Sequence, residues 1–176
     1  MSDQKLSETF IAAASEMLRK GMHKIEHCVA QLNDEQLWWR PRPEVIPQMN
    51  SIANLLLHLA GNMRQWIIAG VGGAKDTRNR PLEFSDRSNR PKAEILGQLE
   101  ATVDEATAVI GRLADSDLTA SRRIQSYDVN VVSALWQTVS HFHGHVQEII
   151  HLTREQLGDG YRFDFVPKGA EQGSAK

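Results

Sequence analysis

The chain has 176 residues, of which 41% are hydrophobic and 24% are charged. A chain of this length can bury a sizeable core, and one domain fits it better than two. Its 20 basic and 22 acidic side chains give a net charge of -2. Because the long-range positive field of a nucleic-acid-binding protein is missing, we expect no nucleic acid among its partners.

Cysteine usage and hydropathy indicate the compartment. Cys28 is the one cysteine, so no disulfide can form within the chain. The first residues lack the basic-then-apolar order of a secretion signal. No apolar run is long enough to span a bilayer. We therefore expect a cytoplasmic protein with no membrane partner.

The first half of the chain predicts two amphipathic helices. Apolar residues recur at three- and four-residue steps over residues 5–32. Three prolines within residues 41–47 exclude a helix there and predict a stiff connection. A second helix begins at Asn50 or Ser51, either of which can cap it, and its apolar stripe runs to the glycines at 70, 72 and 73.

A long loop separates these helices from the second half. Residues 72–90 are polar, rich in arginine and without period. Pro91 suits the first turn of a third helix, whose apolar residues keep close to a heptad spacing as far as Leu113.

The remainder predicts a connector and a fourth helix. Residues 115–130 have the composition of a connector, with a short extended piece at 122–127. The fourth helix covers about 131–157 and ends before Gly158. Four helices of similar length predict an all-α four-helix bundle over residues 1–167, with the long loop between its second and third helices. The small, polar residues 168–176 predict a disordered tail.

Histidines give the strongest functional signal. His141 and His145 are four residues apart, so one helix face presents both imidazoles. A helical wheel places them at the edge of the apolar stripe, and it places His58 likewise on the second helix. Each alone is more often a core histidine bonded to backbone or water, but together they favour a divalent metal ion. Three histidines leave a coordination position open for water or substrate, as in catalytic sites.

Two other patterns compete with this triad. His23 and His27 have the same spacing, but they lie opposite the apolar stripe and are predicted to face solvent or a partner subunit. Glu148 and His151 form a Glu-x-x-His pair of the kind found in di-iron bundles. Such sites need a second copy, which the sequence lacks.

Several residues beside the triad are candidates to support it or to bind substrate. Asn62 and Gln65 follow His58 along a polar seam of the second helix, and His143 flanks the fourth helix on its other side. Gly144 lies between two predicted ligands, where a helical glycine costs about 1 kcal/mol relative to alanine. Close approach of a backbone or substrate explains it, and so does simple tolerance. The four tryptophans could line a pocket, but they are more often core or interface residues.

Three segments carry a family resemblance. Residues 50–63 and 78–84 resemble the second helix and following loop of one subgroup of the DinB-like superfamily of bacterial four-helix metalloproteins. Residues 141–149 are similar to its fourth-helix signature. Carried over position by position, the family's metal triad falls on His58, His141 and His145. The chain departs from the pattern at Gln147-Glu148, usually Gly-Gln, and at Gly144, usually a large residue.

The resemblance implies a bundle, often a homodimer, that binds nickel, zinc or a similar divalent ion. Some relatives use the ion to activate low-molecular-weight thiols such as bacillithiol or mycothiol. We therefore expect a metal-dependent enzyme, an S-transferase or hydrolase, that activates a thiol or water for attack on an electrophilic substrate. The alternative is a non-enzymatic dimeric or stress-related protein in which the ion stabilises the bundle.

Charged residues near the triad complete the candidate set. Arg78 and Arg80, in the loop after the second helix, are candidates to hold a carboxylate of the thiol or its acceptor. The alternative is a solvated or internally paired loop. Glu148, which departs from the family pattern, is a candidate to support a metal-ligating histidine.

Overall fold

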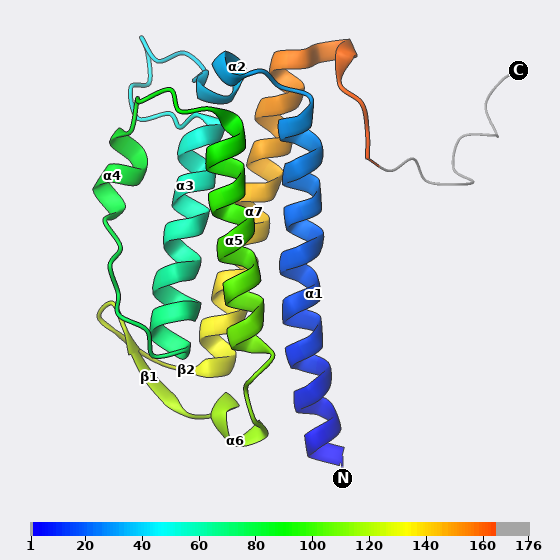
Figure 1. The fold of residues 1–176 in the computed structure, drawn as a ribbon, viewed down its shortest axis with the longest axis vertical. Helices are drawn as coiled ribbons and strands as arrows, with labels where there is room; N and C mark the ends of the chain where they lie inside the picture. The colour runs from blue at the N-terminus through cyan, green and yellow to red at the C-terminus, as the bar shows by residue number, and fades with distance from the viewer. Residues whose placement is uncertain (1, 165–176) are drawn as a thin grey trace, which may run out of the picture.

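Four long helices lie side by side in the computed structural model, which describes residues 2–164 (Figure 1). The all-α four-helix bundle predicted from the sequence is confirmed. The predicted tail at 168–176 and the domain end at 167 lie outside the described residues. The long helices are α1 (Ser2–Ala30), α3 (Ile52–Met63) with its continuation η1 (Arg64–Val71), α5 (Lys92–Ile110) and α7 (Val131–Leu157). The shorter elements are α2 (Asp34–Trp38), α4 (Arg80–Ser85), α6 (Asp115–Leu118), η2 (Gly158–Gly160) and the strands β1 (Ser121–Ile124) and β2 (Tyr127–Asn130).

The order of the helices explains the long loop. α1 packs against α5 and α7, and α3 packs against the same two helices. α3 and α5 run in the same direction, so the chain must return along the outside of the bundle between them (Figure 1). α5 has 19 residues and is therefore about 28 Å long. Residues 72–91 cover this distance as a crossover connection of the kind found in bundles that are not simply up-and-down.

Two segments that the sequence predicts to be a loop and a connector contain regular structure. The crossover includes α4, a helix of 6 residues that is too short to show a helical period. The extended piece expected at 122–127 is an antiparallel hairpin in which β1 pairs with β2. The tip of the hairpin includes Gln125, whose φ is 55°.

The core follows the predicted apolar stripes. Leu18, Leu55, Leu99 and Phe142 represent the four long helices, and each is at most 1% exposed. Their burial against one another is the main stabilising contribution to the fold.

Side-chain caps fix where α3 begins. Ser51 Oγ accepts a hydrogen bond from the backbone N–H of Asn54 at 3.1 Å, and Asn54 Oδ1 accepts one from the N–H of Ser51 at 3.4 Å. This reciprocal pair is a capping box. The Asn54 amide also donates to the backbone oxygens of Glu83 at 2.9 Å and Asp86 at 3.2 Å. The start of α3 is thus tied to α4 through Asn54, about one turn before His58.

The end of the second long helix widens into a π-helix. In η1 the N–H of Gly72 donates to the oxygen of Ile67, five residues back, at 2.8 Å. Such segments are uncommon and are frequent near functional sites. The hairpin packs on η1 so closely that a Cβ at Gly70 would lie 2.5 Å from Ile124 Cδ1. Glycine at position 70 therefore permits this contact.

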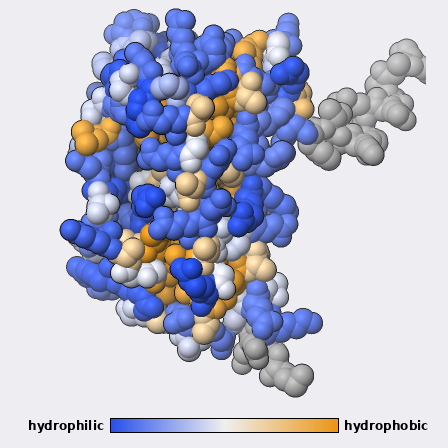
Figure 2. Space-filling model, in the orientation of Figure 1, coloured by the Kyte–Doolittle hydropathy of each residue, from blue (hydrophilic) through white to orange (hydrophobic). Residues whose placement is uncertain are grey.

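The surface seen in Figure 2 is mainly hydrophilic, with hydrophobic residues showing mostly along the middle of that face. This distribution fits amphipathic helices whose apolar stripes face inward. Within residues 2–164, every helix is too short or too polar to cross a membrane.

Two helical glycines test the packing of α1 and α5. A Cβ at Gly21 would lie 2.6 Å from Cε1 of the buried Phe142 ring, whereas one at Gly97 would meet no atom within 4 Å. We expect Gly21→Ala to lower the free energy of unfolding by about 1 kcal/mol, because overpacking outweighs the gain in helix propensity. Gly97→Ala should raise it by up to about 1 kcal/mol. Urea denaturation measures both, and equal stability of the two variants would contradict the packing of α1 on α7.

Candidate metal site

The structure brings the three predicted ligands together from two helices. One ligand atom from each of His58, His141 and His145 lies within 4.8 Å of the other two. Nε2 of His58 is 2.9 Å from Nε2 of His141. The ring centroids of His141 and His145 are 4.6 Å apart. His58 is buried, and the other two are half-buried. α3 and α7 run antiparallel here, so one imidazole from α3 meets two from α7.

A buried carboxylate orients His58. Glu83 of α4 is 8% exposed, and its Oε2 accepts a hydrogen bond from His58 Nδ1 at 2.9 Å. We assign the imidazole proton to Nδ1 because an ionised carboxylate can only accept. Nε2 then keeps its lone pair and faces the other two histidines. The Phe84 ring packs on the same imidazole with a centroid distance of 4.8 Å.

Arg78 keeps Glu83 ionised. Its Nε donates to Oε1 at 2.7 Å and its Nη2 donates to Oε2 at 2.8 Å, which is a bidentate pair. Burial opposes the charge on Glu83, but the hydrogen bonds from Arg78 and His58 outweigh it and lower the pKa of this carboxyl. Glu83 therefore remains a negative acceptor for His58 at neutral pH.

The two histidines of α7 differ in their support. Nδ1 of His145 donates to Glu148 Oε2 at 2.7 Å, so Nε2 is the nitrogen free to bind an ion. Burial, followed by the neighbouring histidine and arginine charges, lowers the pKa of His141 to about 4. His141 is therefore neutral at neutral pH, which is the form of imidazole that binds a metal ion.

The donor set fits a divalent transition metal. Two nitrogens bound to one ion at about 2.1 Å, with an angle between 90° and 109°, lie about 3.0–3.4 Å apart. The observed separation of 2.9 Å between Nε2 of His58 and Nε2 of His141 is close to this range. Imidazole ligands suit zinc and nickel. Hydrogen bonds from Nδ1 to a carboxylate, as made by His58 and His145, are the usual support of metal-binding histidines. These histidines are therefore able to hold a metal ion.

A pocket of about 270 Å³ opens onto the triad. His58 and His141 lie at its base, between α3 and α7, and the hairpin forms part of its wall. Its lining residues are His58, Asn62, Trp66, Arg78, Arg80, Gln125, Tyr127, Gln137, Thr138 and His141. A small molecule in this space would reach the face of the triad that the protein leaves open.

The other residues predicted beside the triad have different positions. Asn62 and Arg80 line the pocket. Gln65 lies further out, where its Oε1 accepts from Arg78 Nη1 at 3.0 Å. Arg78 is paired with Glu83 and its side chain is only 3% exposed, so it supports the site and is not free to bind a substrate carboxylate. Glu148 contacts His145, as a supporting residue would.

His143 and Gly144 are not part of the site. His143 Nε2 lies 2.9 Å from the backbone oxygen of Met17, so this ring faces α1 rather than the triad. The sequence placed His143 on the other side of the fourth helix, but it could not tell that this side faces α1. A Cβ at Gly144 would meet no atom within 4 Å, so simple tolerance explains this glycine. His23 is exposed and its ring faces Glu26 at 3.8 Å, whereas His27 contacts the backbone oxygen of Arg162.

Sequence reasoning missed the contribution of Glu83. This residue stands in the 78–84 segment that carries the family resemblance, but the segment has no helical period. The spacing of Arg78 and Glu83 was the available signal. Trp66, considered only as one of four tryptophans that could line a pocket, does line it. The hairpin residues Gln125 and Tyr127 were missed, and no short-range pattern connects them to His141.

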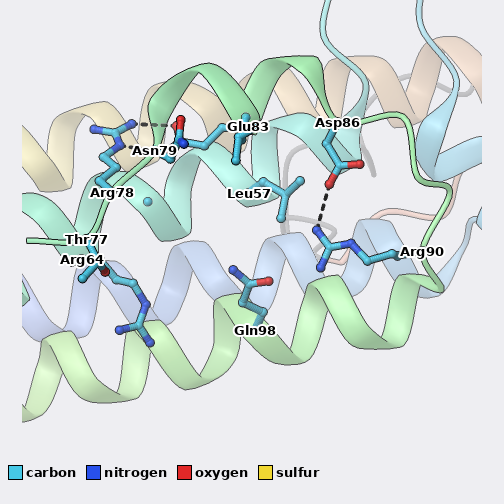
Figure 3. A pocket seen from close by; sticks show the side chains of 11 residues that line it. Leu57, Arg64, Thr77, Arg78, Asn79, Glu83, Asp86, Arg90 and Gln98 are labelled. Carbon is cyan, nitrogen blue, oxygen red and sulfur yellow. Dashed lines mark hydrogen bonds and ion pairs between the residues drawn. The ribbon is translucent and has the colours of Figure 1, made fainter.

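A second cavity, of about 300 Å³, is lined by Arg78 and Glu83 together with residues of α3, α4 and α5 (Figure 3). Leu57 and Leu82 supply apolar lining, and Asp86 accepts a hydrogen bond from Arg90 at 3.0 Å. Arg78 lines both cavities, whereas Glu83 lines only this one.

The fold and the triad together define a four-helix protein of the DinB-like class with a candidate metal site. The chain belongs to the family described as "Protein of unknown function (DUF1572)", a DinB-like family whose model matches residues 5–170. No functionally curated protein matches the chain.

Two crystal structures share the fold. A conserved protein from Enterococcus faecalis is similar with a TM-score of 0.67 and 16% identity, over 81% of this chain and 94% of that chain. A DinB-like protein from Bacillus cereus ATCC 10987 is similar with a TM-score of 0.61 and 14% identity, over 77% of this chain and 85% of that chain. At these identities the likeness establishes the fold.

Gly61 tests the support of His58. A Cβ at this position would overlap Glu83 Oε1 and lie 2.8 Å from Glu83 Cδ. We expect Gly61→Ala to displace the carboxylate and to weaken metal affinity about 10–100-fold, the usual effect of losing such a support. Competition with a chelator measures the affinity. Gly144→Ala is the matched control, because it adds the same methyl group where space is open. Unchanged affinity in Gly61→Ala would contradict the role of Glu83.

Proposed function

We propose that this protein is a metal-dependent enzyme in which a divalent ion, nickel or zinc, activates a thiol or water for attack on an electrophilic small molecule. The observation that supports this most is the convergence of three imidazoles beside a pocket of about 270 Å³, which His58 and His141 line. A structural ion is normally enclosed by four protein ligands, whereas a catalytic ion keeps a position for an exchangeable one.

When bound, a divalent ion lowers the pKa of the thiol or water that it holds, so that the nucleophile forms at neutral pH. The residues of the chain have supporting roles. Glu83 and Glu148 fix the ring orientation of His58 and His145. Trp66 and Tyr127, whose stacked rings have centroids 6.4 Å apart, give one wall an apolar surface.

The alternative is a protein in which the ion only stabilises the bundle. The buried Arg78–Glu83–His58 network supports this reading, since it would tie α4 to α3 in either case. A coordination sphere that does not exchange ligands with added small molecules would favour it.

Metal content tests the triad. Replacing His58, His141 or His145 with alanine should remove the ion, because two imidazoles in a half-exposed site bind divalent metals weakly. His23→Ala/His27→Ala is the control, because those imidazoles contact Glu26 and the backbone oxygen of Arg162 and not the triad. Elemental analysis of unchelated protein gives the stoichiometry. Full occupancy in all three single variants, or loss of metal in the control, would contradict the assignment.

Binding of thiols tests the chemistry. We expect cobalt-loaded protein to develop a sulfur-to-metal charge-transfer band when small thiols are added, because thiolate sulfur is a good ligand of borderline metals. Transfer to electrophilic acceptors is then assayed with the same thiols. If no thiol changes the cobalt spectrum, the S-transferase reading fails and activation of water becomes the better account.

We also propose a homodimer, as the resemblance implies. The support from this chain is an apolar groove between α1 and α7 lined by Phe10, Met17 and Trp136, the last being 67% exposed. Exposed aromatic surface of this kind is enriched at interfaces. Sedimentation velocity should show a dimer at micromolar concentrations, and Trp136→Ser should weaken it. A monomer throughout this range would remove the proposal.

A further inference from the structure

The pocket at the triad has an unbalanced charge. Of its ten lining residues two are arginines and none is acidic. The carboxylates that contact the triad already have partners: Glu83 binds Arg78 and His58, and Glu148 binds His145. Because Glu83 offsets the charge of Arg78, Arg80 leaves the pocket with a net positive charge even before a divalent ion adds its own.

The two arginines differ in what they can do. Arg78 is buried and its guanidinium is used by Glu83 and Gln65. Arg80 is exposed, and its described contact is with the face of the Phe84 ring, 4.9 Å from Cζ to the centroid. Stacking on an aromatic face leaves the N–H groups at the edge of a guanidinium free to donate. Arg80 is thus the cation at this pocket whose charge no carboxylate in residues 2–164 offsets through a salt bridge.

The place of Arg80 in the chain also brings it close to the triad. Arg80 is the first residue of α4, and Phe84, four residues later, packs on His58. The side chain that holds the guanidinium therefore stands on the same short helix that orients a predicted metal ligand. Asn62, Gln125 and Gln137 line the pocket as well and supply neutral amide groups. An anionic ligand would meet one charged donor, with amides around it.

We infer that the pocket selects small molecules carrying an anionic group, and that Arg80 is the residue that binds this group while the other end of the ligand reaches the triad. This inference rests on the proposed function and names the charge of its substrate. A carboxylate and a phosphate would be recognised by the same guanidinium chemistry.

The test uses cobalt-loaded full-length protein and three small thiols of similar size. These are 3-mercaptopropionate (anionic), 2-mercaptoethanol (neutral) and cysteamine (cationic). We expect Arg80→Gln to weaken binding of 3-mercaptopropionate about tenfold, as loss of one charged contact does, and to leave 2-mercaptoethanol unchanged. Comparing one thiol between variants removes differences in thiol acidity. Arg80→Lys should retain most of the preference. Arg112→Gln, which removes the same charge at an exposed position after α5, should bind all three thiols as the wild type does.

A second arm separates this inference from the thiol chemistry. Acetate and inorganic phosphate are titrated without thiol, and the cobalt absorption bands report their binding. If thiols fail to bind but these anions bind and Arg80→Gln weakens them, the proposed thiol chemistry fails and the anion site stands. The anion that binds more tightly identifies the favoured group. Equal binding of anionic and neutral thiols by the wild type, or an anion preference that persists in Arg80→Gln, would overturn the inference.

Discussion

The ion pair between Arg78 and Glu83 is the interaction on which the candidate site depends. Burying a carboxylate is unfavourable unless its charge and its lone pairs are satisfied, and Glu83 meets this condition through three hydrogen bonds from Arg78 and His58. Removing one partner of such a pair typically destabilises a protein by about 3–5 kcal/mol. The same contacts hold α4 against α3 and set the tautomer of His58. The packing of the crossover and the orientation of a predicted metal ligand therefore depend on the same hydrogen bonds.

This arrangement requires the unusual path of the chain. Because α3 and α5 run in the same direction, the connection between them must pass along the bundle (Figure 1). Its helix α4 lies against α3 where Glu83 meets His58. A short loop would leave that imidazole without its carboxylate. Gly61 makes the close approach possible, because any side chain there would occupy the position of Glu83. The backbone oxygens of residues 83 and 86 complete the attachment by accepting hydrogen bonds from Asn54.

Sequence patterns predicted the features that depend on neighbouring residues and missed those that depend on residues far apart in the chain. Helical periodicity is local, so it located the four long helices, and the spacing of His141 and His145 placed two imidazoles on one face. The meeting of His58 with Glu83 joins residues 25 positions apart through a segment without period, and only the tertiary path of the crossover creates it. The prediction for His143 failed for a similar reason. A helical wheel gives the angle of a side chain around its own helix, but it does not say which helix lies next to that side chain. The ion pair of Arg78 could not be predicted without the position of Glu83.

The three imidazoles differ in their carboxylate partners, and this difference distinguishes the supported part of the site from its open face. His58 is anchored by a buried carboxylate from a distant segment, and His145 by Glu148 one turn further along its own helix. His141 has no carboxylate partner among residues 2–164, and it lines the pocket that His145 does not line. A ligand entering between α3 and α7 would therefore approach past His141, in a pocket that the hairpin and Arg80 also line. Of the two anchored histidines, His58 lines this pocket and His145 does not. The open face of the site is thus the one formed by His58 and His141, where charge and space are available to a small molecule.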